Sequence, residues 1–161
     1  MATDQEIAEQ FLNNIRADII TRHISLGQKA SGETISRLRT VPTSLGGILF
    51  GPEHIFALER GRGPTRGGGS GKTLQQRIFD WLAFGKYGLT FGNTKERTSL
   101  SWAISKKIHK KGTDLFIRGG GSGLLTDIVT SQRLDALTGA FAENKATQFK
   151  SEILRNFKDA R

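Results

Sequence analysis

The amino-acid sequence predicts an α+β fold, and three patterns support that prediction. Apolar residues recur at every fourth position from Ile7 to Ile19, the spacing that places side chains on one face of a helix. Two β-compatible runs, 34–41 and 45–50, lie on either side of a turn that begins at Pro42, which is typical of a hairpin. Helical periodicity returns in the second half of the chain. The order helix, hairpin, helices fits one domain with a single core.

The first helix is expected to run from Asp4 to Leu26. It begins at a capping box, in which the Thr3 hydroxyl and the Glu6 carboxylate each accept a hydrogen bond from a backbone N–H. It ends before Gly27, because glycine readily adopts the left-handed backbone that terminates helices. We expect its apolar face to pack on the domain's own sheet, since a lone domain must bury that face somewhere. Packing on a partner protein is the alternative.

The middle of the chain carries shorter elements. Residues 54–60 fit either a strand or a short helix, and we favour a helical turn. A second capping box, formed by Thr73 and Gln76, starts a helix that we expect to end near Gly85. A further helix is expected over residues 94–111, where apolar residues again recur at every fourth position.

Glycine-rich segments interrupt these elements. Gly46 and Gly47, in the second β-compatible run, indicate a bulge or a close approach of another segment to the backbone. The sequence Arg-Gly-Gly-Gly-Ser-Gly occurs twice, at 66–71 and at 118–123. Both copies have the composition of linkers and are too short to signal repeated domains. We expect both to form surface loops.

The C-terminal segment, 124–161, is expected to be helical in two pieces and to extend the α+β domain formed by residues 1–123. The first piece contains Leu125, Ile128 and Val129. The second piece contains Phe149, Ile153, Leu154 and Phe157. This segment has enough apolar residues to dock, either on its own domain or on a neighbouring molecule.

The charge of the chain is its strongest global property. Its 161 residues include 24 Lys and Arg against 15 Asp and Glu, which gives a net charge of +9 and a pI near 10.3. Such a charge attracts polyanions, either nucleic acid or an acidic protein surface. A soluble protein whose surface is merely basic is the plainer alternative.

The composition also excludes several classes of site. The chain contains no cysteine, so disulfides, thiolate zinc sites and cysteine nucleophiles are excluded. It contains no apolar run close to the roughly 18 to 20 residues that a membrane-spanning helix needs. We therefore expect no membrane association, and production in a cytosol-like compartment.

One segment, Gly-Gly-Gly-Ser-Gly-Lys-Thr at 67–73, resembles a phosphate-binding loop. Its spacing is wrong, because that motif requires glycine at the position that Arg66 occupies. No later apolar run ends in an aspartate that could hold magnesium. A nucleotide hydrolase would bind magnesium-nucleotide and lose that binding on Lys72→Ala, and we expect no such binding. A loop that leads into the Thr73 helix explains the segment better.

Catalytic and metal sites are not supported by any spacing in the sequence. The histidines, His23, His54 and His109, lie on different predicted elements and have no partner at metal-ligand spacing. Ser70 and Ser122 lack the flanking glycines of a nucleophile elbow. Carboxylates are scattered, although folding could still bring a pair together. We therefore assign no catalytic residue, no metal ligand and no cofactor.

The basic residues are the remaining candidates for function. Neither a zinc finger nor a basic zipper is present, and the aromatic residues do not alternate with basic ones as stacking platforms would. Positive charge without an element that recognises bases suits contact with the phosphates of a nucleic acid of any sequence. Basic residues near 106–111 also complement the negative end of their helix, which is a structural alternative. The candidate contacts are Arg60, Arg62, Arg66, Lys72, Lys106, Lys107, Lys110 and Lys111.

Four segments in order carry a family resemblance. They are Ala-Ser-Gly at 30–32, Leu-Glu-Arg-Gly-Arg-Gly-Pro at 58–64, Ile-Phe-Asp-Trp-Leu at 78–82, and Ala-Ile-Ser-Lys-Lys-Ile-His-Lys-Lys-Gly-Thr at 103–113. Together they resemble the neck proteins of tailed bacteriophages, of the tail-completion or head–tail joining type. The resemblance covers roughly residues 7–113.

This resemblance implies an α+β fold with a long N-terminal helix against a small antiparallel sheet, further helices outside, and no enzymatic activity. It implies a structural virion protein, assembled in the host cytoplasm as a closed ring of twelve or six copies between portal-side and tail-side proteins. The basic candidates would then contact non-specific duplex DNA in the channel or acidic partners. A monomeric, sequence-independent nucleic-acid-binding protein is the alternative.

The sequence departs from the family pattern in two places. The loop after the Gly-Arg-Gly-Pro segment is often proline-rich in the family, whereas residues 66–72 are rich in glycine. The helical end after Leu124 is longer than the family leads us to expect, so it is a candidate docking arm.

Overall fold

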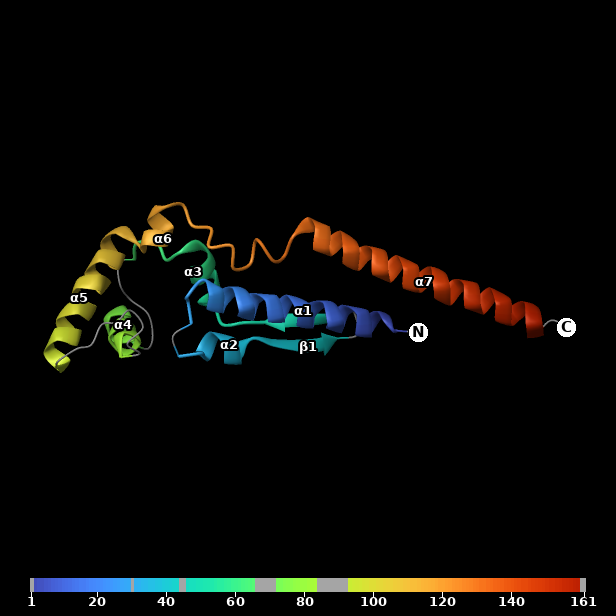
Figure 1. Cartoon of the computed structure of the whole chain (residues 1–161), viewed down its shortest axis with the longest axis horizontal. Coiled ribbons are helices and arrows are strands. Elements are labelled where there is room, and N and C mark those ends of the chain that lie inside the picture. Colours follow the sequence, from blue (N-terminus) through green and yellow to red (C-terminus); the bar gives the residue numbers. More distant parts are fainter. Residues whose placement is uncertain (1, 30, 44–45, 66–71, 84–92, 160–161) are drawn as a thin grey trace.

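The structure is a computed structural model that describes residues 2–29, 31–43, 46–65, 72–83 and 93–159 of the chain (Figure 1). Its elements are α1 (Asp4–Ser25), α2 (Glu33–Arg37), β1 (Arg39–Thr43), β2 (Gly46–Phe50), α3 (Ile55–Arg60), α4 (Leu74–Leu82), α5 (Thr94–Lys111), α6 (Asp114–Ile117) and α7 (Ser131–Asp159). Helices dominate, and β1 and β2 form a small antiparallel sheet. The predicted α+β class is confirmed.

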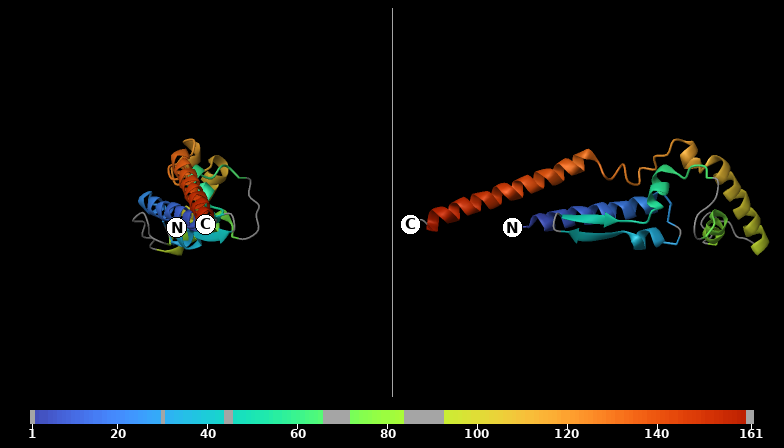
Figure 2. Two further views of the ribbon diagram at one scale, coloured as in Figure 1. Left: turned by 90° about the vertical axis from the view of Figure 1, so that its right-hand side faces the viewer. Right: turned by 180° about the vertical axis from the view of Figure 1, so that it is seen from behind.

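The long helix α1 is the middle layer of the molecule. The β1–β2 hairpin contacts it on one side and α7 on the other (Figures 1 and 2). The predicted capping box is present, since Glu6 N donates to Thr3 Oγ1 at 3.1 Å and Thr3 N donates to Glu6 Oε2 at 2.6 Å. The helix ends one residue before the predicted Leu26, and Gly27 has φ +66°. Its predicted packing on the sheet is confirmed.

The hairpin forms as predicted, but its first strand begins later. The register pairs Arg39 with Phe50 and Val41 with Ile48. Pro42, which we placed in the turn, lies within β1, where an edge strand tolerates its missing N–H. The predicted close approach at Gly47 is confirmed, because a Cβ there would lie 2.7 Å from the Leu12 side chain of α1.

The predicted strand from Thr34 is wrong over its first half, because residues 33–37 form the short helix α2. Thr34 and Ile35 have β propensity, but tertiary contacts override it. The Thr34 hydroxyl lies 2.9 Å from His54 Nε2, and Thr34 is buried. Leu38, the residue directly after α2, belongs to the core and is 2% exposed. The helical turn thus places both side chains inside.

The core lies between α1, the start of β1, α3 and the segment after the second glycine-rich loop. Its buried residues are Ile15, Ile19, Leu38, Ile55, Leu124 and Ile128. Full burial of each such side chain contributes about 1.5 to 3 kcal/mol. Leu124 has no exposed surface at all, so the chain beyond residue 123 completes this core.

The predicted helical piece around Leu125 and Val129 is wrong, because residues 119–130 form turns and bends. The Glu59 carboxylate binds the backbone N–H of Leu125 and the Thr126 hydroxyl, and these long-range bonds replace local helical ones. The second glycine-rich segment, 118–123, is a loop as expected. It is nevertheless fixed, since Gly121 N and Ser122 N donate to the Glu59 carbonyl. The first copy, 66–71, lies outside the described residues.

Helices α4 and α5 pack on each other at one end of the molecule (Figure 1). The predicted capping box of α4 is present, with Gln76 N donating to Thr73 Oγ1 at 3.2 Å. The helix ends at Leu82, and the predicted stop at Gly85 lies outside the described residues. Helix α5 ends at Lys111 as predicted. The helical turn predicted for 54–60 is confirmed by α3.

Helix α7 confirms the predicted second helical piece and is a single helix of 29 residues. Two ion pairs join it to α1. Arg133 lies 2.7 Å from Asp18, and Lys145 lies 2.6 Å from Asp4. Because Asp4 is the first residue of α1, the C-terminal part of α7 continues past the end of that helix (Figure 1).

Candidate anion-binding cleft

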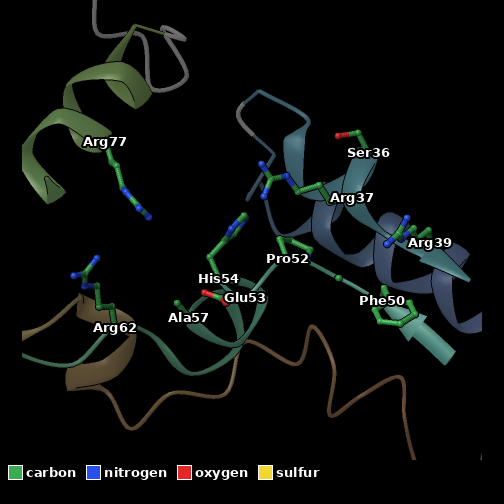
Figure 3. A pocket seen from close by; sticks show the side chains of 11 residues that line it. Ser36, Arg37, Arg39, Phe50, Pro52, Glu53, His54, Ala57, Arg62 and Arg77 are labelled. Carbon is green, nitrogen blue, oxygen red and sulfur yellow. The ribbon is translucent and has the colours of Figure 1, made fainter. Parts of the chain in front are cut away.

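A cleft of about 1000 Å³ lies between the hairpin and α3 on one side and α4 on the other (Figure 3). Four arginines line it: Arg37, Arg39, Arg62 and Arg77. Glu53 is the carboxylate among its lining residues, all of which belong to the described part of the chain. Phe50, Pro52 and Ala57 supply apolar surface. Because guanidinium groups stay charged at any physiological pH, the cleft carries an excess of positive charge.

Arg37 and Arg39 reach the cleft from the two sides of buried Leu38. Arg37 forms an i,i+4 ion pair with Glu33 at 2.7 Å, but both side chains are more than half exposed. Such a pair contributes less than about 1 kcal/mol and leaves the guanidinium available. Arg39 Cζ lies 5.4 Å from the centre of the Phe50 ring, its partner across the hairpin.

Arg62 is held at the cleft by its backbone. Its N–H donates to Thr113 Oγ1 at 2.9 Å, and its carbonyl accepts from Thr113 N at 2.8 Å. The preceding Gly61 has φ +78°, and a Cβ there would collide with the backbone of Phe116. The Arg62 guanidinium makes no hydrogen bond or ion pair with the described residues. Its side chain is therefore free to bind a ligand.

Arg77 enters from α4, on the opposite side of the cleft from Arg37 of α2 and Arg39 of β1 (Figure 3). Its Nε donates to the Lys72 carbonyl at 3.3 Å, which leaves its terminal nitrogens directed into the open space. Arg62 and Arg77 thus present guanidinium forks from separate elements to one volume. A fork of this kind binds the oxygens of phosphate or carboxylate in pairs.

The structure places one of the predicted contact residues, Arg62, in this cleft. Arg60 lies instead at a second cavity of about 550 Å³, which Phe116 and Gly119 also line. Lys72 forms an exposed ion pair with Asp80 at 2.7 Å. Arg66 lies outside the described residues.

The predicted lysines of α5 lie away from the cleft. Lys107 forms an exposed ion pair with Asp114 at 2.9 Å. Lys106, Lys110 and Lys111 are exposed and line neither of the two cavities described above. They belong to a basic surface of α5. The structure therefore separates our candidate contacts into Arg62, which lines the cleft, and residues that lie elsewhere.

Sequence reasoning missed Arg37, Arg39 and Arg77. A signal for the first two exists, since they flank a leucine in the run Arg-Leu-Arg at 37–39, just before the hairpin. Arg77 carries no such signal, because its role depends on how α4 packs.

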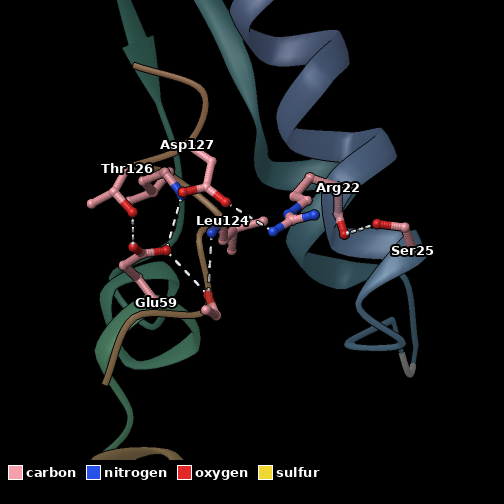
Figure 4. A network of polar contacts seen from close by, with 8 residues as sticks. Arg22, Ser25, Glu59, Leu124, Thr126 and Asp127 are labelled. Carbon is pink, nitrogen blue, oxygen red and sulfur yellow. Dashed lines mark hydrogen bonds and ion pairs between the residues drawn. The ribbon is translucent and has the colours of Figure 1, made fainter. Parts of the chain in front are cut away.

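A buried carboxylate, Glu59, joins α3 to the turns after the second glycine-rich loop and lines the second cavity (Figure 4). Glu59 is 2% exposed, and it accepts hydrogen bonds from Thr126 Oγ1 at 2.7 Å, Leu125 N at 2.9 Å and Ser122 Oγ at 3.1 Å. Burial raises the pKa of Glu59, but these hydrogen bonds outweigh it, and its pKa lies below the usual value. The ionised carboxylate therefore clamps the turns after the glycine-rich loop to α3.

The histidines have structural partners on separate elements. His54 contacts Thr34, His109 Nδ1 lies 2.8 Å from Thr65 Oγ1, and buried His23 lies 3.3 Å from Gln28 Oε1. Within the described ranges, no group of three or more His, Asp or Glu could hold a metal ion. In the same part of the chain, no helix is both long and apolar enough to cross a membrane.

Comparisons with known proteins give no assignment. No protein-family model matches the chain, and neither a curated protein nor a solved structure matches it significantly.

Proposed function

We propose that this chain is a structural adapter in the neck of a tailed bacteriophage. Copies of it form a ring, with portal-side proteins on one face and tail-side proteins on the other, and DNA passes through the open centre. The observation that carries this proposal is the arginine cleft, where Arg62 and Arg77 converge without a matching set of carboxylates. The chemistry of that cleft suits phosphates and requires no base contacts.

The four resembling segments support the proposal because two of them build the cleft. Residues 58–64 provide Arg62, and residues 103–113 end at Thr113, whose two hydrogen bonds fix the Arg62 backbone. Thr65, which directly follows residues 58–64, also donates its N–H to the His109 carbonyl at 3.2 Å. Segments that resemble one family are thus in contact at the candidate site.

A ring gives this cleft a function that a single copy would perform poorly. Each copy has a net charge of +9, and a ring of six or twelve copies repeats that charge around one axis. Phosphate contacts that ignore sequence hold DNA in position but release it easily when salt is high. Such contacts suit a channel through which a whole genome must pass.

Negative-stain electron microscopy of the purified chain tests this function, alone and with an isolated portal ring. We expect closed rings with an open centre, or single copies that the portal captures in a fixed number. Copies that stay monomeric and do not join the portal would contradict the proposal.

The same cleft favours a second candidate function, a monomeric protein that binds nucleic acid of any sequence. Four arginines around one volume are sufficient for salt-dependent binding without a ring. The two functions differ in self-association, because only the neck adapter requires a symmetric assembly or a ring-shaped partner.

A further inference from the structure

Trp102 is an exposed tryptophan on a strongly basic helix. Helix α5 carries six Lys and Arg against one Glu, and Trp102 is 62% exposed. Tryptophan is highly buried in most folded proteins. The sequence predicted no aromatic platform for stacking, because Trp102 lies beside the apolar stripe of its helix. The structure instead leaves the indole at the surface.

The covered side of α5 explains why Trp102 is exposed. Helix α4 packs on α5 at this end of the molecule (Figure 1). Gln75 Nε2 of α4 donates to Ser101 Oγ at 2.7 Å, and Arg97 Cζ lies 3.7 Å from the centre of the Phe79 ring of α4. Successive residues turn by about 100° around a helix, so Trp102 points well away from the side that carries Arg97 and Ser101.

Two lysines lie on the same side of α5 as Trp102. Lys106 follows Trp102 by four residues and Lys110 by eight, which places them one and two turns farther along this side. Both lysines are exposed, and at 1.5 Å per residue they lie about 6 Å apart along the helix axis. Ser99 and Ala103, the exposed neighbours of Trp102, are small and leave space beside its ring. We call Trp102, Lys106 and Lys110 the Trp102 face.

The carboxylates of α5 and α6 are engaged away from this face. Glu96 lies in the first turn of α5, where its Oε1 accepts from Asn93 Nδ2 at 3.3 Å. Asp114 of α6 pairs with Lys107 at 2.9 Å. Within the part of the chain that the structure describes, neither Lys106 nor Lys110 forms an ion pair. The Trp102 face therefore combines uncompensated positive charge with an accessible aromatic ring.

We propose that the Trp102 face binds single-stranded nucleic acid, with one base stacked on the indole and phosphates on Lys106 and Lys110. An aromatic ring beside cations is the combination by which proteins bind unpaired strands of any sequence. The bases of a duplex are stacked inside it, so a duplex offers phosphates to the lysines but no free base to the ring. The site shares no residue with the arginine cleft, goes beyond the proposed function and does not rest on it.

Two other partners fit the chemistry of this face less well. A membrane surface binds a helix through a broad apolar side, whereas the Trp102 face has one large apolar side chain. A second copy of the chain would bury lysines at the contact, and lysine is depleted at protein interfaces. A single strand uses both the ring and the cations.

Titration with an oligo(dT) of about 15 nucleotides, a length that single-strand binding domains cover, tests the site. We expect the strand to quench tryptophan fluorescence, because a base stacks on Trp102. In anisotropy with a labelled strand, Trp102→Ala should weaken binding by about 5- to 150-fold, the effect of losing one stacked base. The matched control is Phe56→Ala on α3, which removes a ring that is 63% exposed and should leave binding unchanged. Equal effects of the two variants overturn the proposal.

The lysines are tested by the salt dependence of the same binding. For Lys106→Gln with Lys110→Gln, the slope of log Kobs against log salt should become shallower by about 1.4, since each phosphate contact of a single strand contributes about 0.7. An unchanged slope overturns the assignment of these two residues to phosphates.

Ligands without an unpaired base separate stacking from charge. Trp102→Ala should leave the binding of poly-glutamate, and of the same strand annealed to oligo(dA), unchanged. A loss of duplex binding equal to the loss for oligo(dT) overturns the stacking. Vesicles of phosphatidylserine and phosphatidylcholine should not change the fluorescence, and a larger change with vesicles than with oligo(dT) assigns the face to a membrane and overturns the proposal.

The oligomer distinguishes this site from the neck function. Native mass spectrometry of Trp102→Ala should give the same copy number as the natural chain. An oligomer that dissociates in this variant, while strand binding persists, assigns Trp102 to a subunit contact and overturns the proposal. A natural chain that forms the ring but does not bind oligo(dT) overturns the single-strand site and leaves the neck function standing.

Discussion

Arg62 and Thr113 are joined by two hydrogen bonds, although they lie 51 positions apart in the chain. The Arg62 N–H donates to the Thr113 hydroxyl at 2.9 Å, and the Thr113 N–H donates to the Arg62 carbonyl at 2.8 Å. The same hydroxyl caps α6 by accepting from Phe116 N at 3.4 Å. One threonine thus fixes both the start of a helix and the position of a cleft arginine.

Replacing this threonine should loosen the cleft. We expect Thr113→Ala to lower the free energy of unfolding by about 1 to 2 kcal/mol, because it removes a helix cap and a partner of the Arg62 N–H. Urea denaturation measures the loss. The matched control is Thr138→Ala, whose hydroxyl bonds only a carbonyl of its own exposed helix and should cost less than about 0.5 kcal/mol. Equal effects of the two variants would contradict the role of Thr113.

Removing two cleft arginines should weaken DNA binding in a salt-dependent way. For Arg62→Gln with Arg77→Gln, the slope of log Kobs against log salt should become shallower by about 2, since each phosphate contact contributes about 0.9. Fluorescence anisotropy with a random duplex at several salt concentrations measures this slope. Lys29→Gln with Lys95→Gln removes the same charge at exposed positions and is the control. If the control variant changes the slope as much, net charge rather than the cleft binds DNA.

The Glu59 clamp predicts acid sensitivity. Its pKa is lowered in the folded protein, so its contribution to stability is complete above the unfolded value near 4.5 and is lost as pH falls through the folded value. Glu59→Gln should reduce the free energy of unfolding at pH 7 by on the order of 2 kcal/mol, because hydrogen bonds to the charged carboxylate are lost. The difference between the two proteins should shrink between pH 5 and pH 3, measured by urea denaturation. A constant difference across this range would exclude the clamp as its cause.

Lys72 should have no role in nucleotide binding. In the structure it pairs with Asp80, and the capping box at Thr73 and Gln76 accounts for the residues that follow it. Isothermal titration calorimetry with magnesium-ATP should give no binding heat. A heat signal that disappears in Lys72→Ala would support a nucleotide site and contradict the adapter function.

Local patterns predicted the parts of the fold that local interactions determine. The two capping boxes, at Thr3 and Thr73, each join residues three positions apart, so the sequence alone was sufficient to find them. The α1 stripe and the hairpin were predictable for the same reason. The five-residue helix at Thr34 was not, because its burial against His54 depends on a contact 20 residues away.

The candidate site was predictable only in part. Arg62 could be proposed from its glycine-flanked segment, whereas Arg37, Arg39 and Arg77 come together only when α2, the hairpin and α4 pack around one volume. The turns at Leu125 were missed because their hydrogen bonds go to Glu59, which lies 66 residues away. A helical period in the sequence contains no information about such a partner.

Native mass spectrometry of the purified chain, alone and with a short random-sequence duplex, is the most direct test of the neck adapter. The adapter function predicts a closed oligomer of fixed copy number, six or twelve, whose protein stoichiometry does not change when DNA is added. Monomers that load onto the duplex in a salt-sensitive way, and that a portal ring does not capture, would contradict it and favour the monomeric nucleic-acid-binding protein.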